Sequence, residues 1–210
     1  MDHSQFAASI FNKYAREYQE KFMDVSLYHE SFTLFCNNLK KQNAEILELA
    51  CGPGNITWYL LNSRPDLVIT GTDLSPNMIE LAKENNPQAD FHVMDCRDIS
   101  KITTPYDGIM AGFCFPYLNK TEAIKFIQDA SKLLKSGGIL YISTMEDDNH
   151  KSGLRKGSQG DELFMNFHEA GYLTTALTAN NFTLIELQRI LTHPPDGSTV
   201  VDLILIARRA

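Results

Sequence analysis

The stretch that most constrains the fold covers residues 45–55, which read E-I-L-E-L-A-C-G-P-G-N. Its apolar residues predict a short strand, Gly52-Pro53-Gly54 forces a tight turn, and residues 56–61 favour a helix. A glycine lets the backbone approach a ligand closely, and a helix start presents unpaired N–H groups with a partial positive charge. The order of strand, glycine turn and helix therefore predicts a binding site for a carboxylate or a phosphate.

Acidic residues end the next two predicted strands. The apolar run at residues 67–72 leads to Asp73, and the run at residues 91–94 leads to Asp95. An acid at this distance after a glycine turn can hold a ribose, and an acid after the following strand can bind an adenine amino group. Asp73 could instead be a simple capping or turn residue. The parallel placement of the two acids favours nucleoside binding.

Together these features resemble the class I S-adenosylmethionine-dependent methyltransferases, whose glycine motif usually reads acid-x-Gly-x-Gly-x-Gly. Here the motif starts at Glu48 and reads acid-x-Ala-x-Gly-x-Gly, with Ala50 in place of the first glycine. The resemblance covers about residues 45–144, and the flanking pattern is most similar to the small-molecule branch typified by quinone-biosynthesis and trans-aconitate methyltransferases. It implies S-adenosyl-L-methionine as the cofactor and a small molecule as the methyl acceptor.

The resemblance also implies roles for individual residues. Asp73 would hold the ribose hydroxyls, Asp95 with Cys96 would contact the adenine edge, and Glu48 would lie beneath the amino acid part of the cofactor. Two tyrosines that precede the glycine turn would place their hydroxyls near the cofactor carboxylate, or would only pack. The implied cofactor-binding residues are Tyr14, Tyr18, Glu48, Ala50, Gly52, Gly54, Asp73, Leu74, Met78, Asp95, Cys96 and Ala111.

The resemblance and the order of predicted elements imply an α/β fold in a single domain of residues 1–210. We expect a Rossmann-like, mostly parallel seven-stranded sheet with helices on both faces and a C-terminal antiparallel hairpin. Residues 1–44 form a helical N-terminal cap, and residues 45–145 form the cofactor-binding core. Residues 146–167, which are rich in charge and glycine, form either a mobile lid or a surface insertion, and residues 168–210 form a helix and the hairpin.

Local patterns predict where elements begin and end. Apolar and aromatic residues recur every four positions over residues 6–18, which predicts one amphipathic helix. Two C-terminal strands, at residues 182–191 and 199–207, are joined by turn residues 193–198. Predicted helix starts are Ser75 with Pro76, Asn119 with Glu122, and Asn166 with Glu169, and a predicted helix stop is Gly137-Gly138.

The composition limits the classes of function. With 43% hydrophobic and 21% charged residues, the chain is typical of a soluble globular protein. Its net charge of −7 argues against a nucleic acid substrate, because affinity for phosphates comes chiefly from clustered Lys and Arg. Without a signal-like segment or an apolar run of about 18 residues, we expect a cytoplasmic protein that has no membrane partner. The four cysteines form no Cys-x-x-Cys pair, so no metal site is predicted. The oligomeric state stays open.

Candidate acceptor-site residues follow the strand predicted at residues 106–112. Phe113, Phe115 and Tyr117 could line an apolar pocket or belong to the core. His168 is the first candidate for a catalytic base and Tyr172 the next, because a histidine at a loop-to-helix junction can titrate near neutrality. Histidines at helix starts are also often structural. Methyl transfer depends mainly on aligning the nucleophile, so the reaction requires no dedicated base.

Two other functions remain compatible with a glycine turn and a ribose-binding acid. An NAD(P)-dependent oxidoreductase uses the same features, but the turn lacks the third glycine of that motif, and Asp95 would have no role. A cofactor-binding module without catalysis could act through partner proteins. Binding of nicotinamide and adenosyl cofactors, and methyl turnover, separate the three alternatives.

Overall fold

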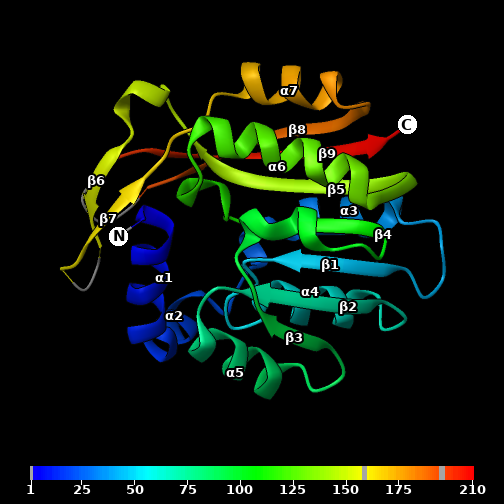
Figure 1. The fold of residues 1–210 in the computed structure, drawn as a ribbon. Helices are drawn as coiled ribbons and strands as arrows, with labels where there is room; N and C mark the ends of the chain where they lie inside the picture. Colours follow the sequence, from blue (N-terminus) through cyan, green and yellow to red (C-terminus); the bar gives the residue numbers. More distant parts are fainter. Residues whose placement is uncertain (1, 158–159, 194–196) are drawn as a thin grey trace.

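The computed structural model describes residues 2–157, 160–193 and 197–210, which form a seven-stranded sheet and a two-stranded sheet (Figure 1). The large sheet has the strand order β3-β2-β1-β4-β5-β9-β8, in which the first five strands are parallel and β9 is antiparallel to both neighbours. The predicted sheet and its C-terminal hairpin are confirmed, while residues 194–196 of the predicted turn lie outside the described residues. The strands of the large sheet are β1 (Glu45–Leu49), β2 (Val68–Asp73), β3 (Asp90–Val93), β4 (Tyr106–Ala111), β5 (Leu134–Glu146), β8 (Phe182–Thr192) and β9 (Val200–Arg209).

Helices cover both faces of the large sheet, as predicted. The α6 and α7 helices pack on one face, α3 and α4 pack on the other, and α5 lies against β2 and β3. None of the helices in the described part of the chain has the length and apolarity to cross a membrane. The helices are α1 (His3–Lys13), α2 (Ala15–Phe22), α3 (His29–Asn38), α4 (Asn55–Ser63), α5 (Pro76–Asn85), α6 (Lys120–Leu133) and α7 (Ala170–Ala179), with short 3-10 turns η1 (Ser26–Tyr28), η2 (Cys96–Lys101), η3 (Phe115–Tyr117) and η4 (Asn149–Lys151).

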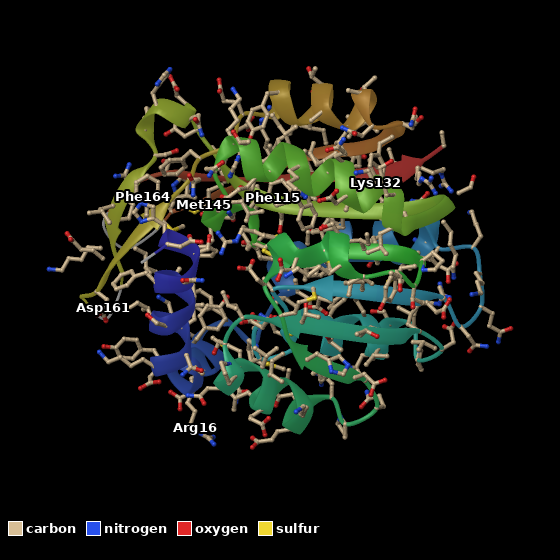
Figure 2. All side chains as sticks on the ribbon, viewed as in Figure 1. Arg16, Phe115, Lys132, Met145, Asp161 and Phe164 are labelled. Atoms are coloured by element: carbon tan, nitrogen blue, oxygen red, sulfur yellow. The ribbon has the colours of Figure 1, made fainter. Side chains whose placement is uncertain are left out.

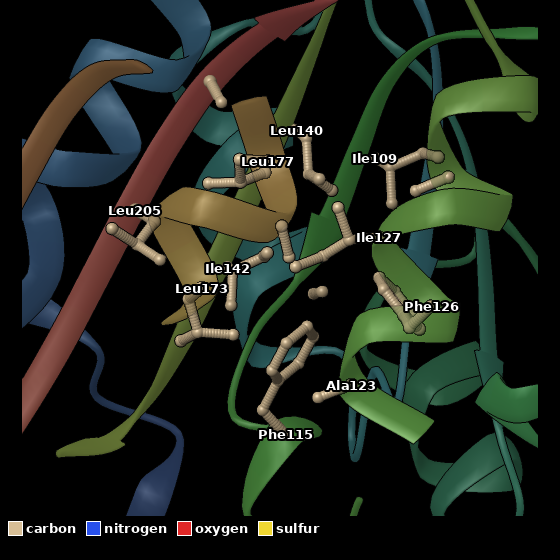
Figure 3. Packing of buried hydrophobic residues seen from close by; sticks show 14 of the residues in the cluster. Ile109, Phe115, Ala123, Phe126, Ile127, Leu140, Ile142, Leu173, Leu177 and Leu205 are labelled. Atoms are coloured by element: carbon tan, nitrogen blue, oxygen red, sulfur yellow. The ribbon is translucent and has the colours of Figure 1, made fainter. Parts of the chain in front are cut away.

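The central strands bury side chains on both faces, which explains their nearly continuous apolar sequences. Leu47 and Leu49 of β1 face the core under α6 and α7, whereas Ile46 faces the core under α3 and α4. Figure 3 shows the first of these cores, where Ile127 of α6 and Leu173 of α7 pack over the sheet. Packed cores on both faces thus hold the sheet in place and position the edge at which its parallel strands end.

Two of the predicted helix starts are confirmed. Ser75 caps α5 by accepting a hydrogen bond from the N–H of Met78, and Asn119 with Glu122 forms a complete capping box on α6. The third prediction is wrong, because Asn166 instead donates from Nδ2 to the carbonyl of Pro116, and no side chain caps α7. The predicted stop at Gly137-Gly138 is also wrong, since α6 ends at Leu133 and β5 begins at the next residue.

The single helix predicted over residues 6–18 is divided into α1 and α2, because the backbone leaves the helical conformation at Tyr14 (φ −113°, ψ 31°). Ser4 of α1 donates from its hydroxyl to the carbonyl of Tyr117 at 2.7 Å. The ring of His3 stacks on that of Phe164, with centroids 4.4 Å apart. The α1 helix is therefore fastened across the end of the large sheet.

The predicted lid-like insertion contains regular structure. After η4 it forms the antiparallel strands β6 (Gly153–Lys156) and β7 (Glu162–Met165). Figure 1 shows this small sheet beside α1, at the end of the large sheet where the arrow of β1 points. Together with α1 and α2, the insertion frames the region above the glycine turn.

Candidate active site

The turn after β1 contains three residues in the left-handed backbone region, which are Ala50 (φ 55°), Gly52 (φ 53°) and Gly54 (φ 77°). A Cβ on Gly54 would lie 2.4 Å from Nδ2 of Asn86, so this glycine allows the turn to pack against α5. A Cβ on Gly52 would lie 3.8 Å from the ring of Tyr18, which is an ordinary contact. Ala50 and Gly52 line a cavity, whereas Gly54 serves packing.

Asp73 ends β2 and holds the glycine turn in place. Its Oδ2 accepts a hydrogen bond from the N–H of Gly52 at 3.0 Å, and its Oδ1 accepts one from the N–H of Ser75 at 2.8 Å. Burial raises the pKa of Asp73, and these N–H groups oppose the shift. The carboxylate is thus fixed between the carboxyl ends of β1 and β2, where a nucleoside would lie in an open α/β sheet.

Glu48 is a fully buried carboxyl on β1. Its Oε2 accepts a hydrogen bond from the hydroxyl of Thr57 on α4, and its Oε1 has no hydrogen-bond partner among the described residues. Burial raises the pKa of Glu48 to about 8, the bond from Thr57 opposes this, and the charge of Asp73 adds to it. A buried carboxyl with a free oxygen is suited to accept a bond from a cationic donor.

The carboxylate of Asp95 is already occupied. Arg97 donates to it from Nε at 3.0 Å and from Nη2 at 2.6 Å, and the N–H of Arg97 adds a bond at 2.9 Å. The same guanidinium pairs with Asp2 at the start of α1 and with Glu122 of α6. Arg97 therefore links the predicted adenine-binding acid to the N-terminal cap, so Asp95 is poorly placed to be a free hydrogen-bond acceptor for a base.

Other predicted cofactor residues lie away from the cavity or at its margin. Met78 is buried and packs with Ala15 and Leu81, and Ala111 is buried in the core under α6 and α7. Leu74 and Cys96 are half-buried. These side chains support the walls, and none of them lines the cavity in the part of the chain that the structure describes.

A cavity of about 830 Å³ opens at the carboxyl edge of the sheet. Its walls come from α1 and α2, the glycine turn, the segment after β4, the β6–β7 sheet and the start of β9. Figure 2 shows Met145, at the end of β5, and Phe164 of β7 at this edge. The predicted residues that line it are Tyr14, Tyr18, Ala50, Gly52, Phe113 and Tyr117.

The three predicted pocket residues in the segment after β4 do not all face the cavity. Phe113 has a left-handed backbone (φ 53°), and its N–H donates to Oγ of Ser143 at 2.9 Å. Phe113 and Tyr117 line the cavity. Phe115 follows the core alternative and does not line the pocket, because its ring is fully buried against Phe126, with centroids 5.2 Å apart (Figure 3). The η3 turn breaks the strand alternation and directs this ring into the core.

His168, which is buried, and Tyr172, which is half-buried, form a structural pair and supply no base at the cavity. Nε2 of His168 lies 2.8 Å from the carbonyl of Phe115 and donates to it, while Nδ1 contacts the hydroxyl of Tyr172. His168 is fully buried, and burial lowers its pKa. Neither side chain lines the cavity. Because a neutral ring fastens the segment after β4 to α7, the interpretation of His168 as a base is contradicted by its position.

Among the described residues, no cluster of three or more His, Cys, Asp or Glu side chains has an arrangement that could hold a metal ion. The cysteines Cys36, Cys51, Cys96 and Cys114 are free thiols.

Comparison with known proteins identifies the fold around this cavity. Residues 46–138 match a family described as "Methyltransferase domain", which includes the glycine turn and Asp73. The chain contains a methyltransferase domain. A malonyl-[acyl-carrier protein] O-methyltransferase of Priestia megaterium is 33% identical over 148 residues, which cover 69% of this chain and 53% of the relative. The chain thus spans about half the length of the curated relatives that it matches.

Solved structures share the fold of the methyltransferase domain across the whole chain. The magnesium protoporphyrin IX methyltransferase of Synechocystis PCC 6803, solved with SAH, gives a TM-score of 0.74 at 16% identity and covers 100% of both chains. The Burkholderia thailandensis 1,6-didemethyltoxoflavin-N1-methyltransferase gives a TM-score of 0.71 at 21% identity and covers 100% of this chain and 91% of the other. Together with the family match at residues 46–138 and the curated relatives, this shared fold confirms the predicted resemblance to class I methyltransferases.

The cavity of the methyltransferase domain also contains residues that the sequence pattern did not reveal. Tyr28 and Phe32 come from the segment before β1, and Arg155 and Phe167 come from the insertion. Asp202 of β9 is 5% exposed and lines the cavity. The sequence does contain one signal for Asp202, which is a single acid within an apolar stretch of a predicted strand. A charge at such a position requires a partner or a function.

Proposed function

We propose that this chain is an S-adenosyl-L-methionine-dependent methyltransferase that acts on a small molecule. The observation that carries the proposal is the Asp73 carboxylate, which accepts a bond from the N–H of Gly52, a residue that lines the cavity in a methyltransferase domain. The net charge of −7 supports a small-molecule acceptor rather than a nucleic acid. A cavity of about 830 Å³ has room for a nucleoside cofactor and a small acceptor together.

The residues around the glycine turn fit this cofactor. Asp73 would accept bonds from the ribose hydroxyls, Gly52 and Ala50 would border the methionine part, and the fully buried Glu48 would lie beneath the amino acid part. Tyr18 lies over Gly52 and would cover the same part. When bound, the cofactor supplies an electrophilic methyl group on a sulfonium. Because Arg97 holds Asp95, we assign the main polar contact with the nucleoside to Asp73.

The residues of the chain contribute to the reaction mainly by positioning the acceptor and by excluding water from the cavity. Phe113 is held by its bond to Ser143, and Tyr117 lies edge-on to Phe11 of α1 with centroids 5.3 Å apart. These rings form apolar walls beside the end of β4. Well-oriented reactants can gain roughly 7 to 11 kcal/mol over reactants free in solution, which exceeds the contribution of one general base. Alignment of the acceptor between α1 and the end of β4 is therefore the main catalytic device.

Calorimetry with S-adenosylmethionine, S-adenosylhomocysteine and NADH tests the proposal. We expect both adenosyl ligands to bind and NADH not to bind. Preferred binding of NADH would support the oxidoreductase alternative and refute the proposed function. Transfer of a labelled methyl group to a compound in a small-molecule extract separates an enzyme from a non-catalytic module, because such a module binds the cofactor without turnover.

A further inference from the structure

We propose that Asp202 and Tyr28 select the methyl acceptor by binding a molecule that presents an N–H or O–H group and by disfavouring one that presents a carboxylate. This inference rests on the proposed function, because the acceptor and the methyl donor must share the cavity. The pair lies on elements that are far apart in sequence, since Tyr28 precedes α3 and Asp202 belongs to β9.

The sheet register places Asp202 at the reactive edge. Asp202 pairs with Met145 at the end of β5, and β5 lies beside β4, whose end leads to Phe113. The ring of Tyr28 lies 5.2 Å from that of Phe113, measured between centroids. Asp202, Tyr28 and Phe113 all line the same cavity. The pair therefore adjoins the strand end beside the glycine turn, where an acceptor would meet the methyl donor.

Asp202 retains unused capacity to accept hydrogen bonds. The hydroxyl of Tyr28 donates to its Oδ2 at 2.8 Å, and no cation pairs with the carboxylate among the residues that the structure describes. A carboxylate offers about four acceptor positions, of which the phenol fills one. Burial raises the pKa of Tyr28, so the phenol stays protonated and keeps donating. Burial also raises the pKa of Asp202, and the bond from Tyr28 opposes this.

The acidic side chain of the pair lies deep in the cavity, whereas the basic side chains of the wall lie at its surface. Asp202 is buried, whereas the basic wall residues Lys21, Arg155 and Lys156 are exposed. The guanidinium of Arg155 also donates to two backbone carbonyls of its own segment. A carboxylate acceptor placed against Asp202 would meet a like charge without a buried cation, which is unfavourable. An N–H or O–H group would instead supply the donor that Asp202 lacks, and the rings of Tyr28 and Phe113 provide an apolar surface for the rest of the molecule.

The same carboxylate can take the proton that the reaction releases. The bond that forms joins the acceptor nitrogen or oxygen to the methyl carbon of the sulfonium donor. The bond that breaks joins this carbon to sulfur, which keeps the electron pair and becomes a neutral thioether. The proton of the N–H or O–H group passes to Asp202 and then to solvent. Tyr28 is a positioning residue in this scheme, because it orients the carboxylate.

Three probes with one phenyl ring test the selectivity: benzylamine, benzyl alcohol and benzoate. Their dissociation constants are measured by ligand-observed NMR on the full chain saturated with S-adenosylhomocysteine. We expect the wild-type protein to bind benzylamine, benzyl alcohol or both at least 10-fold more tightly than benzoate. The first two probes distinguish an amine acceptor from a hydroxyl acceptor. Equal or tighter binding of benzoate, or no binding of the other two at millimolar concentrations, would overturn the proposal.

Variants assign the selectivity to the pair. Asp202→Asn should reduce the preference over benzoate at least 10-fold, whereas Asp24→Asn, which changes an exposed acid in the same wall, should leave it unchanged. Tyr28→Phe removes the bond that orients the carboxylate and should also reduce the preference over benzoate, which tests the pair if the Asn variant does not fold. An unchanged preference in folded Asp202→Asn refutes the assignment. Calorimetry with S-adenosylhomocysteine on each variant reports separately on the proposed function.

Discussion

Replacement of the buried carboxyl Glu48 by glutamine should make the protein's stability less dependent on pH. Burial raises the pKa of Glu48 in the folded protein to about 8, from an ordinary value of 4.5. Between these values the folded protein holds a proton that the unfolded chain has released. The contribution of Glu48 to stability is therefore greatest below about pH 4.5 and is lost as the pH rises through about 8.

The size of the effect follows from this shift. A rise from 4.5 to about 8 corresponds to at most about 5 kcal/mol, at about 1.4 kcal/mol for each pH unit. Glutamine keeps an oxygen that can accept the bond from Thr57, but it places an amide N–H₂ where Oε1 has no partner, at a pH-independent cost of about 1–3 kcal/mol. Glu48→Gln should thus be less stable than wild type at pH 5 and should gain about 2–5 kcal/mol relative to it by pH 9.

Urea unfolding at pH 5, 7 and 9, without cofactor, measures this difference. Glu45→Gln is the matched control on the same strand, because a bond from Lys135 lowers the pKa of Glu45 instead of raising it. The stabilisation by Glu45 is present above its unfolded pKa and is lost as the pH falls, so its variant should differ from wild type by a constant amount from pH 6 to 9. A Glu48→Gln difference that stays within about 0.5 kcal/mol from pH 5 to 9 would refute the reasoning.

Three further changes test the site and its support. Asp73→Ala should weaken S-adenosylhomocysteine binding by about 1 kcal/mol or more, whereas Asp98→Ala, at a surface turn, should not; calorimetry that finds equal affinities would count against the nucleoside site. Gly54→Ala should lower the melting temperature, since its Cβ would lie 2.4 Å from a side-chain nitrogen, whereas Gly171→Ala in α7 meets open space and should stabilise by about 0.5–1 kcal/mol. His168→Ala should cost about 2–4 kcal/mol in denaturant unfolding and leave S-adenosylhomocysteine affinity unchanged; a fully stable variant without methyl transfer would restore His168 as a candidate base.

The sheet and the nucleoside edge could be predicted because local patterns determine them. Leu47 and Leu49 belong to an apolar run bounded by a glycine turn, and this pattern is enough to predict a buried parallel strand. The position of Asp73 follows from the strand that precedes it. Ala50 and Gly52 lie at the cavity for the same reason, since a turn at a strand end must face the edge of the sheet.

The acceptor side could not be predicted because it depends on contacts between distant segments. Phe113 and Phe115 are two residues apart, yet one faces the cavity and the other the core, because the η3 turn follows Phe113. The pairing of Asp95 with Arg97 is local, but its link to Asp2 requires α1 to fold across the sheet. Asp202 appears in sequence as an isolated acid, and only the sheet register places it beside Met145.

The fastening of α1 across the sheet has a consequence for biosynthesis. Ser4 bonds to Tyr117, which lies 113 residues later, and His3 stacks on Phe164, which is later still. The α1 and α2 helices leave the ribosome before these partners and must therefore wait, with their aromatic residues uncovered, until Tyr117 and Phe164 have been translated. Docking of α1 is consequently a late event in folding, and a nascent chain cannot enclose a ligand before its sheet is assembled.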